Sequence, residues 1–457
     1  MTSTNAASTV EPDRVRQLLE RERGQFVATH PRSVDYRRRA EPSMLYGVPM
    51  NWMTRWASPS PVVVASAYGA TIEDIDGNAY VDLCLGDTGA MAGHGPAPVV
   101  AAIAEQMAQG ATFMLPTENA IWVAEEMTRR FGMSRWQFCL TASDANRFVL
   151  RLARQITGRQ KVVIHNWCYH GSVDETLASL DGNGAVIARE GSVGPSYDVT
   201  ESTRVVEIND LDALQAALAD GKVACVLVEP ALTNIGIVLP DADYHRELRR
   251  ITRETGTLLV IDETHTICAG PGGYTAREGL EPDLVTIGKT IGGGVPIAAY
   301  GMSDDVAASI VAQTFWHEAD VGGVGGTLAG NALSLAAARA TLGEVLTEEA
   351  FERMESLAIG LCDGIESVIA DCGAPWHVTR LGCRAEYLFS PEPPRNGAEA
   401  AAAGDEDLDA LLHLAMLNRG VLLTPFHNMT LMSPATTADQ VDTHTAAFAA
   451  IVAELLS

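Results

Sequence analysis

Apolar runs alternate with amphipathic stretches from about residue 71 to residue 340. Three of these runs, residues 224–230, 257–263 and 283–289, have the length and the branched side chains of buried strands. Between the first two, residues 244–256 repeat apolar positions with helical spacing, which predicts a crossover helix. Strands that alternate with helices in this way predict an α/β fold with a parallel sheet and helices on both faces.

The pattern changes after about residue 340. Residues 383–389 and 420–425 predict short strands among helices, and the Pro- and Ala-rich residues 391–407 predict a surface loop that runs into a helix. Residues 341–457 therefore predict a smaller α+β domain. We expect three parts in chain order: an N-terminal segment (1–70), a large domain (71–340) and a C-terminal small domain (341–457).

The composition is that of a globular protein with a strongly acidic surface. The chain has 457 residues, is 47% hydrophobic, and carries a formal net charge of -26. Such a charge disfavours nucleic acid or an anionic membrane as a partner, because phosphate groups would be repelled. A small anionic ligand must then be bound by local donors.

The cysteines and the N-terminus suggest a cytoplasmic protein. The eight cysteines never form a C-x-x-C pair, which argues against a zinc site and against a disulfide scaffold. The first residues lack the basic-then-apolar order of a secretion signal, and no uncharged stretch is long enough to span a bilayer. We therefore expect a cytoplasmic location without a metal.

Polar side chains follow the three apolar runs. Glu229, Asp262 and Lys289 come at the carboxyl ends of successive predicted strands, where open α/β sheets bind their ligands. Each of them, taken alone, could equally be a helix cap or a surface charge. Together they predict a ligand site at one edge of the sheet.

Lys289 lies in "IGKTIGGG", a glycine-rich stretch that invites comparison with a phosphate-binding P-loop. A P-loop has a glycine upstream of its Gly-Lys pair, but the corresponding residue here is Asp283, and the other glycines follow the lysine. The sequence therefore argues against a P-loop. A nicotinamide-dependent dehydrogenase is disfavoured for a similar reason, since no G-x-G-x-x-G links an early strand to a helix.

An acid at one strand end and a lysine at the next is an arrangement that pyridoxal phosphate enzymes need. The lysine forms a Schiff base with the cofactor, and the carboxylate keeps the pyridine nitrogen protonated. Asp262 and Lys289 would fill these two roles. Many other α/β enzymes also place acids and lysines at strand ends, so this spacing alone leaves the alternatives open.

Several motifs in order make the sequence resemble a known family. The stretches "VLVEP", "LLVIDE", "TIGKTIGGGVPIAAYG" and "GGTLAGNALSLAAA" resemble the class III aminotransferases of the fold-type I pyridoxal phosphate superfamily, in the branch that includes glutamate-1-semialdehyde aminomutase. The resemblance implies a large cofactor-binding domain with a mostly parallel seven-stranded sheet sandwiched by helices. It also implies a smaller α+β domain, with the N-terminal segment joining that domain and the active-site entrance.

The resemblance implies roles for individual residues around the cofactor, pyridoxal 5'-phosphate. Lys289 would be the Schiff-base lysine and Asp262 the partner of the pyridine nitrogen. Tyr169 would stack on the ring, although it could also be an ordinary core tyrosine. Thr264 would pack on the opposite face of the ring, and Asn234 would lie near the phenolic oxygen.

The phosphate would bind at "TASDAN", which opens a predicted helix. Amides near Ala142, together with the Ser143 hydroxyl, would present donors and a positive helix end to the phosphate. A plain N-cap by Ser143 or Asp144 is the alternative. Ala142 departs from the glycine usual in the family but leaves the amide donors. Thr327 matches a threonine that reaches the phosphate from a neighbouring subunit, which implies a homodimer.

Substrate choice is less defined by the sequence. Arginine is the residue that most often binds a substrate carboxylate. Arg55 and Arg384 are the candidates, although each could instead be a structural or surface arginine. The aminomutase branch carries an arginine and a serine near the segment that matches "GVPMNWM", whereas Met50 and Met53 fall nearby here, and it has a glutamate where this chain has Asn428. These departures argue against the aminomutase reaction.

The remaining candidates favour an apolar pocket. Trp52 and His427, with Phe426, would form an apolar or aromatic wall. We therefore expect an aminotransferase that moves an amino group from an amine or amino acid, with an apolar or aromatic substituent, to a keto acid. An aminomutase or racemase is the alternative. A non-catalytic relative is disfavoured because the lysine, the acid and the phosphate loop occur together.

Overall fold

A computed structural model describes residues 10–194, 197–313 and 322–457. The chain divides into two compact units. Unit 1 contains residues 1–96, 349–393 and 402–457, and unit 2 contains residues 97–348 and 394–401.

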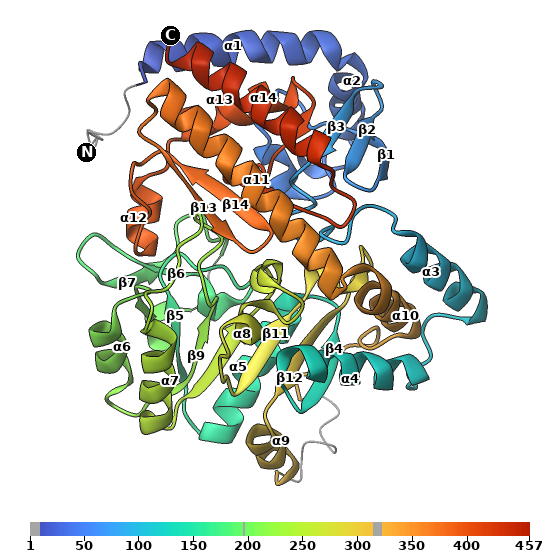
Figure 1. Ribbon diagram of the computed structural model, residues 1–457. Coiled ribbons are helices and arrows are strands. Elements are labelled where there is room, and N and C mark those ends of the chain that lie inside the picture. Colours follow the sequence, from blue (N-terminus) through green and yellow to red (C-terminus); the bar gives the residue numbers. More distant parts are fainter. Residues whose placement is uncertain (1–9, 195–196, 314–321) are drawn as a thin grey trace. The chain divides into compact units, whose positions relative to one another are not determined.

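Unit 2 is built on a seven-stranded sheet with the order β4-β12-β11-β10-β9-β5-β8 (Figure 1). One strand, β12, pairs antiparallel with both of its neighbours, and the other pairs that join β11 to β8 are parallel. The predicted mostly parallel sheet is therefore present. Its strands, in sheet order, are Arg135–Cys139, Ala298–Met302, Leu284–Ile287, Leu258–Asp262, Val223–Val228, Lys161–His165 and Thr203–Val206.

Helices flank this sheet, as the alternating pattern predicts. In α7 (Tyr244–Thr255) the buried residues Tyr244, Leu248 and Ile251 recur at helical spacing, and the helix packs on β10. Gly256, with φ of 60°, ends it in a left-handed cap. The other helices of this unit are α3 (Ala97–Gln109), α4 (Glu118–Phe131), α5 (Ala142–Thr157), α6 (Leu211–Leu218), α8 (Gly273–Arg277), α9 (Asp304–Val311) and α10 (Ala332–Ala340).

Unit 1 contains two smaller sheets. One has the order β1-β2-β3-β15 and the other, β13-β14-β16, is antiparallel. The strands are β1 (Val64–Tyr68), β2 (Thr71–Asp74), β3 (Ala79–Asp82), β13 (His377–Leu381), β14 (Arg384–Leu388), β15 (Val421–Leu422) and β16 (Met429–Leu431). The long helices are α1 (Pro12–Thr29), α2 (Pro31–Ala40), α11 (Glu348–Cys372), α13 (Glu406–Leu417) and α14 (Ala438–Leu455). The Pro- and Ala-rich segment runs into the short α12 (Gly397–Ala402), of which all but Ala402 belongs to unit 2.

The divisions between the units fall at residues 96/97 and 348/349, and again at 393/394 and 401/402, whereas the sequence suggested 70/71 and 340/341. The difference at the first boundary has a simple cause. Strand β2 pairs with β1, β3 pairs with β2, and the two-residue β15, far along the chain, pairs parallel with β3. Residues 71–82 are therefore held in the sheet of unit 1 rather than in that of unit 2.

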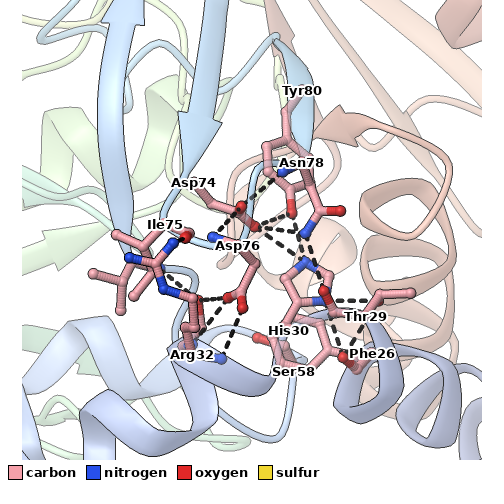
Figure 2. A network of polar contacts seen from close by, with 12 residues as sticks. Phe26, Thr29, His30, Arg32, Ser58, Asp74, Ile75, Asp76, Asn78 and Tyr80 are labelled. Atoms are coloured by element: carbon pink, nitrogen blue, oxygen red, sulfur yellow. Dashed lines mark hydrogen bonds and ion pairs between the residues drawn. The ribbon is translucent and has the colours of Figure 1, made fainter.

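A buried polar network ties the N-terminal helices to the β2–β3 hairpin (Figure 2). The Tyr80 hydroxyl donates to Asp74 Oδ2 at 2.7 Å and lies 2.5 Å from Nε2 of His30, which follows α1. Asp76 accepts hydrogen bonds from the amides of Arg32 and Ser33, at 2.7 and 2.9 Å, at the start of α2. A carboxylate at a helix N-terminus is stabilised by the free amides there.

The described residues bear on three features that the sequence disfavours: disulfides, a metal site and a membrane-spanning helix. None of the eight cysteines, all of which lie in the described ranges, forms a disulfide, and seven are buried. Within residues 10–194, 197–313 and 322–457 there is no cluster of three or more His, Cys, Asp or Glu side chains that could hold a metal ion. In the same ranges, none of the helices has the length and apolar character needed to cross a membrane.

Candidate active site

A cavity of about 280 Å³ lies in unit 2, where β10 and β11 end. Six residues singled out from the sequence line it together: Lys289, Asp262, Ala142, Ser143, Tyr169 and Thr264. The other lining residues are Leu140, Thr141, His170, Gly171, His265, Pro296 and Ile297. The fold thus gathers side chains from five separate segments around one space.

Asp262 is the last residue of β10 and is almost fully buried. Its Oδ2 accepts hydrogen bonds from Asn146 Nδ2 at 2.7 Å and His170 Nδ1 at 2.9 Å, and its Oδ1 accepts one from the Thr264 amide at 3.0 Å. Burial favours the neutral acid, but the hydrogen bond and the positive charge of His170 outweigh it, so the pKa of Asp262 lies below its ordinary value. The carboxylate is therefore held in its ionised form.

His170 and Asn146 are supporting residues that the sequence reading missed. Burial lowers the pKa of His170, but nearby Cys168 and the hydrogen bond to Asp262 raise it well above its ordinary value. Asn146 also donates to the His170 carbonyl at 3.1 Å and accepts from Thr286 Oγ1 at 2.7 Å. In the sequence, only two features pointed to them: His170 follows Tyr169, and Asn146 is the last residue of "TASDAN".

Lys289 follows β11 and opens a short 3-10 turn, Lys289–Gly292. Its backbone has φ of 53°, in the left-handed region that non-glycine residues rarely adopt. Such strain persists where the surrounding structure holds the residue in place, and it is frequent at functional sites. The Lys289 Nζ lies 2.9 Å from His265 Nε2, a contact that the sequence reading also missed.

The N-terminus of α5 forms one wall of the cavity. Thr141 is the N-cap, accepting from the Asp144 amide at 3.1 Å, so neither Ser143 nor Asp144 takes the capping role considered above. Ser143 Oγ instead accepts from the Ser172 amide at 3.1 Å. Gly171, with φ of 80°, packs on Ser143 so closely that a side chain there would overlap the hydroxyl.

Ala142 packs against the glycine that precedes Lys289. A Cβ at Gly288 would lie 3.0 Å from the Ala142 Cβ and 3.1 Å from its amide nitrogen. The methyl group of Ala142 therefore occupies space beside Gly288 rather than closing the amide-lined end of the helix.

Glu229, the third of the polar residues that follow the predicted strands, contacts the backbone of a residue that lines the cavity. Its Oε1 accepts a hydrogen bond from the Tyr169 amide at 3.1 Å, and its Oε2 accepts one from Thr233 Oγ1. Burial raises the pKa of this carboxyl. Glu229 does not line the cavity. Its place in the site is to hold the backbone of Tyr169.

The other residues predicted from the sequence do not line this cavity. Asn234 is half-buried and Thr327 is exposed, both in unit 2. The substrate candidates Trp52, Arg55, Arg384 and His427 all belong to unit 1.

Within unit 1 the substrate candidates form two groups. Trp52 meets Phe426 edge-on at 6.1 Å between ring centroids, and the Arg55 guanidinium lies 5.9 Å from the Phe426 ring. Arg384 is fully buried, 3.5 Å from Glu386, which also lies 2.6 Å from His427 Nδ1. Arg384 therefore already neutralises a buried carboxylate of its own strand.

The lining residues suit pyridoxal 5'-phosphate. The buried Thr264 Oγ1 and His170 Nε2 have no hydrogen-bond partner among the described residues. Asp262 supplies an ionised carboxylate for a protonated pyridine nitrogen, and Lys289 supplies a primary amine. The start of α5 supplies amides and the Ser143 hydroxyl for a phosphate. The donor set thus matches the amine-reactive, cationic and anionic parts of the cofactor.

Comparison with known proteins agrees with this site. The model of the class III aminotransferase family matches residues 52–452. A glutamate-1-semialdehyde 2,1-aminomutase from Roseiflexus castenholzii is 36% identical over 370 residues, which cover 80% of this chain and 84% of that protein.

Solved structures agree as well. A glutamate-1-semialdehyde aminomutase from Pseudomonas aeruginosa PAO1 is 48% identical with a TM-score of 0.96, covering 98% of this chain and all of that one. A variant of it was solved in complex with PMP. An omega-transaminase from Sphaerobacter thermophilus is 27% identical with a TM-score of 0.85, covering 93% of this chain and 98% of that one.

These comparisons confirm the expected fold-type I architecture and the expected cofactor, pyridoxal 5'-phosphate. They do not confirm the expectation of an aminotransferase in preference to an aminomutase, because the relatives with the higher identities are aminomutases by name. The chain belongs to the class III aminotransferase family.

Proposed function

We propose that this protein is a pyridoxal phosphate-dependent aminomutase of the glutamate-1-semialdehyde type. The observation that carries the proposal is the 48% identity to the Pseudomonas protein across 98% of the chain. In such a reaction an amino group moves from one carbon of the substrate to its neighbour, and no second substrate is needed. The proposal reverses our preference from the sequence, which rested on three departures in loops near Met50, Met53 and Asn428.

The chain's own residues divide the work of holding the cofactor. Pyridoxal 5'-phosphate, when bound, supplies an aldehyde that bonds to amines and a ring that accepts electrons from the substrate. Lys289 would hold it covalently through Nζ, and Asp262 would keep its ring nitrogen protonated. The α5 amides and the Ser143 hydroxyl would hold the phosphate, and Tyr169 would pack on the ring.

Lys289 also moves the proton. Once its Nζ is free of the cofactor, this amine would take the proton from the substrate carbon that bears the nitrogen, hold it on Nζ and later give it back. Asp262 stays ionised throughout, because three hydrogen bonds and the charge of His170 hold it so. The side chain at 289 therefore has two roles and the side chain at 262 has one.

The reaction can be tested without a keto acid. We expect the purified protein, loaded with cofactor and given glutamate-1-semialdehyde alone, to form the isomer with the amine on carbon 1 and the ketone on carbon 2. The total amine should stay constant. Lys289→Ala should abolish the reaction. Formation of product only after a keto acid is added would reject the aminomutase proposal.

An aminotransferase remains the second candidate, favoured by the aromatic pair in unit 1. Trp52 and Phe426 are both exposed, and Arg384 is paired with Glu386. These residues therefore suit an apolar group of a substrate better than a substrate carboxylate. This candidate predicts turnover of aromatic amines with pyruvate or 2-oxoglutarate. If a panel of such donors gives no turnover while the semialdehyde isomerises, the second candidate is rejected.

The homodimer, the contribution of Thr327 across its interface and the cytoplasmic location stay predictions. The exposed position of Thr327 is compatible with a contact to a second subunit. Light scattering would measure the mass of the particle. For a dimer that shares its sites, Thr327→Ala should weaken binding of the cofactor without unfolding the protein.

A further inference from the structure

We propose that His265 is the proton acceptor and donor for the amino group of Lys289. The inference rests on the proposed function, in which the Lys289 Nζ is the reacting amine. The observation is the 2.9 Å separation between the Lys289 Nζ and His265 Nε2, at the surface of the candidate cavity. An imidazole is well matched to this exchange, because its protonated and neutral forms are both accessible near neutral pH.

The imidazole is held by a rigid turn. His265 is 8% exposed and lies between β10 and a short 3-10 turn, Thr266–Ala269. The neighbouring carboxylate of Glu263 accepts hydrogen bonds from the amide and hydroxyl of Thr275, both at 2.5 Å, and from Thr266 Oγ1 at 2.5 Å. The backbone around His265 is therefore fixed from several directions.

Close packing against Glu263 strengthens this constraint. The amide of Tyr274 donates to Glu263 Oε2 at 3.1 Å, and the amide of Glu263 donates to the Thr286 carbonyl at 2.8 Å, on the strand that leads to Lys289. A side chain at Gly273 would collide with the Glu263 carboxylate. The turn that carries the imidazole and the strand that leads to the lysine are thus joined directly.

The proton balance of the step is simple. A protonated Lys289 loses one hydrogen from Nζ to His265 Nε2, the electron pair of the broken bond stays on Nζ, and the positive charge moves to the imidazole. The neutral amine can then form its carbon–nitrogen bond. When the lysine is released, the proton returns.

The other titratable groups that line the cavity are placed differently. Asp262 is ionised and occupied by its three hydrogen bonds, and His170 is engaged with Asp262. Tyr169 is 43% exposed. The geometry therefore assigns the exchange with Lys289 to His265.

The first test measures how fast cofactor-free protein bonds to pyridoxal 5'-phosphate. The chain has three lysines, at 161, 222 and 289, so borohydride reduction and peptide mass spectrometry report each one separately. We expect His265→Gln, which cannot take the proton, to slow capture at Lys289 by about a hundredfold. His245→Gln, on α7 and outside the cavity, is the matched control and should leave the rate unchanged.

Chemical rescue separates proton transfer from a structural role. His265→Ala leaves space for a free imidazole, and we expect added imidazole to restore capture, with more basic imidazoles restoring it more. The Gln variant leaves no such space and should not respond. Wild-type capture rates in His265→Gln, or no rescue of the Ala variant by any imidazole, would overturn the proposal.

A second readout does not require the cofactor. In protein with ¹⁵N-labelled histidine, the Nε2 signal of His265 should shift when Lys289 is replaced by Met, and the signal is assigned by its loss in His265→Gln. An unchanged Nε2 signal would overturn the inference even if the cofactor binds. Failure of the wild type to capture the cofactor would count against the proposed function instead.

Discussion

Asp262 shows at the scale of one residue how a buried carboxylate stays charged. Desolvation of an acid favours its neutral form, and three donors plus the charge of His170 reverse that preference. Asn146 is in turn fixed by Thr286. The carboxylate is therefore preorganised for a cation, and it does not have to rearrange when one binds.

Replacing this charge tests its role. We expect Asp262→Asn, which keeps the size of the side chain but not its charge, to lower turnover at least about a hundredfold while Lys289 still bonds to the cofactor. Steady-state kinetics and the absorbance spectrum measure the two effects separately. Asp212→Asn, exposed on α6, is the control. Turnover of the Asn variant near that of wild type would contradict the assigned role.

The sequence predicts residues that follow strands or belong to a motif, and it misses those defined by contact. Lys289, Asp262 and Ser143, which line the cavity, were singled out because each lies at a strand end or a helix start. Asn146 and His265 were missed because their partners, Asp262 and Lys289, are distant in the chain and only the fold brings them together.

At the scale of elements, the sequence pattern predicted single helices and strands, but it did not predict which distant strands pair. The predicted helix at 244–256 is α7, and the predicted strands match β9, β10 and β11 within a few residues. The pairing of β15 with β3 could not be predicted, because two residues carry no periodic pattern. Together with the β1–β2 and β2–β3 pairs, that pairing holds residues 71–82 in a sheet of unit 1.

We expect the polar network in Figure 2 to contribute to the free energy of unfolding. Tyr80→Phe removes the hydroxyl that donates to the buried Asp74 and lies against His30. We expect a loss of about 1–3 kcal/mol in the free energy of unfolding, since a buried carboxylate loses a donor. Urea denaturation measures it.

Tyr68→Phe is the matched control for this loss. Tyr68 is on β1 and 78% exposed, whereas Tyr80 is 2% exposed. The control should unfold at the wild-type urea concentration. Equal stability of the two variants would show that the network does not hold the helices.

A buried acid on helix α13, Asp409, leads us to expect that stability depends on pH. Burial raises the pKa of Asp409 to about 7, against a hydrogen bond from Asn428 Nδ2 at 2.8 Å that lowers it. An acid with a raised folded pKa stabilises the fold below its unfolded pKa of about 4, and this contribution is lost as the pH rises towards 7.

We therefore expect wild-type stability to fall by about 2 kcal/mol more than that of Asp409→Asn between pH 5 and pH 8. Urea titrations at both pH values measure the difference. Glu406→Gln, exposed on the same helix, should follow the wild type. Parallel pH profiles for the wild type and Asp409→Asn would contradict the raised pKa.

At the scale of the whole molecule, the net charge of -26 and the local donors serve different purposes. The net negative charge disfavours polyanions as partners, whereas the amides at the N-terminus of α5 and the Ser143 hydroxyl would suit one small anion. The family and the architecture followed from motifs in order along the chain. The choice between aminomutase and aminotransferase did not, because the sequence argument for it rested on a few residues, Met50, Met53 and Asn428, rather than on a motif or a periodic pattern.

The most direct measurement of the central claim is to reduce the cofactor-loaded protein with borohydride and map the modified peptides. Lys289 is one of three lysines in the chain, and it is the one that lines the cavity with Asp262. The account predicts a pyridoxyl group on Lys289 and on neither Lys161 nor Lys222, with the label lost in Lys289→Ala. A label on either of the other lysines, or no label on any of them, would contradict it.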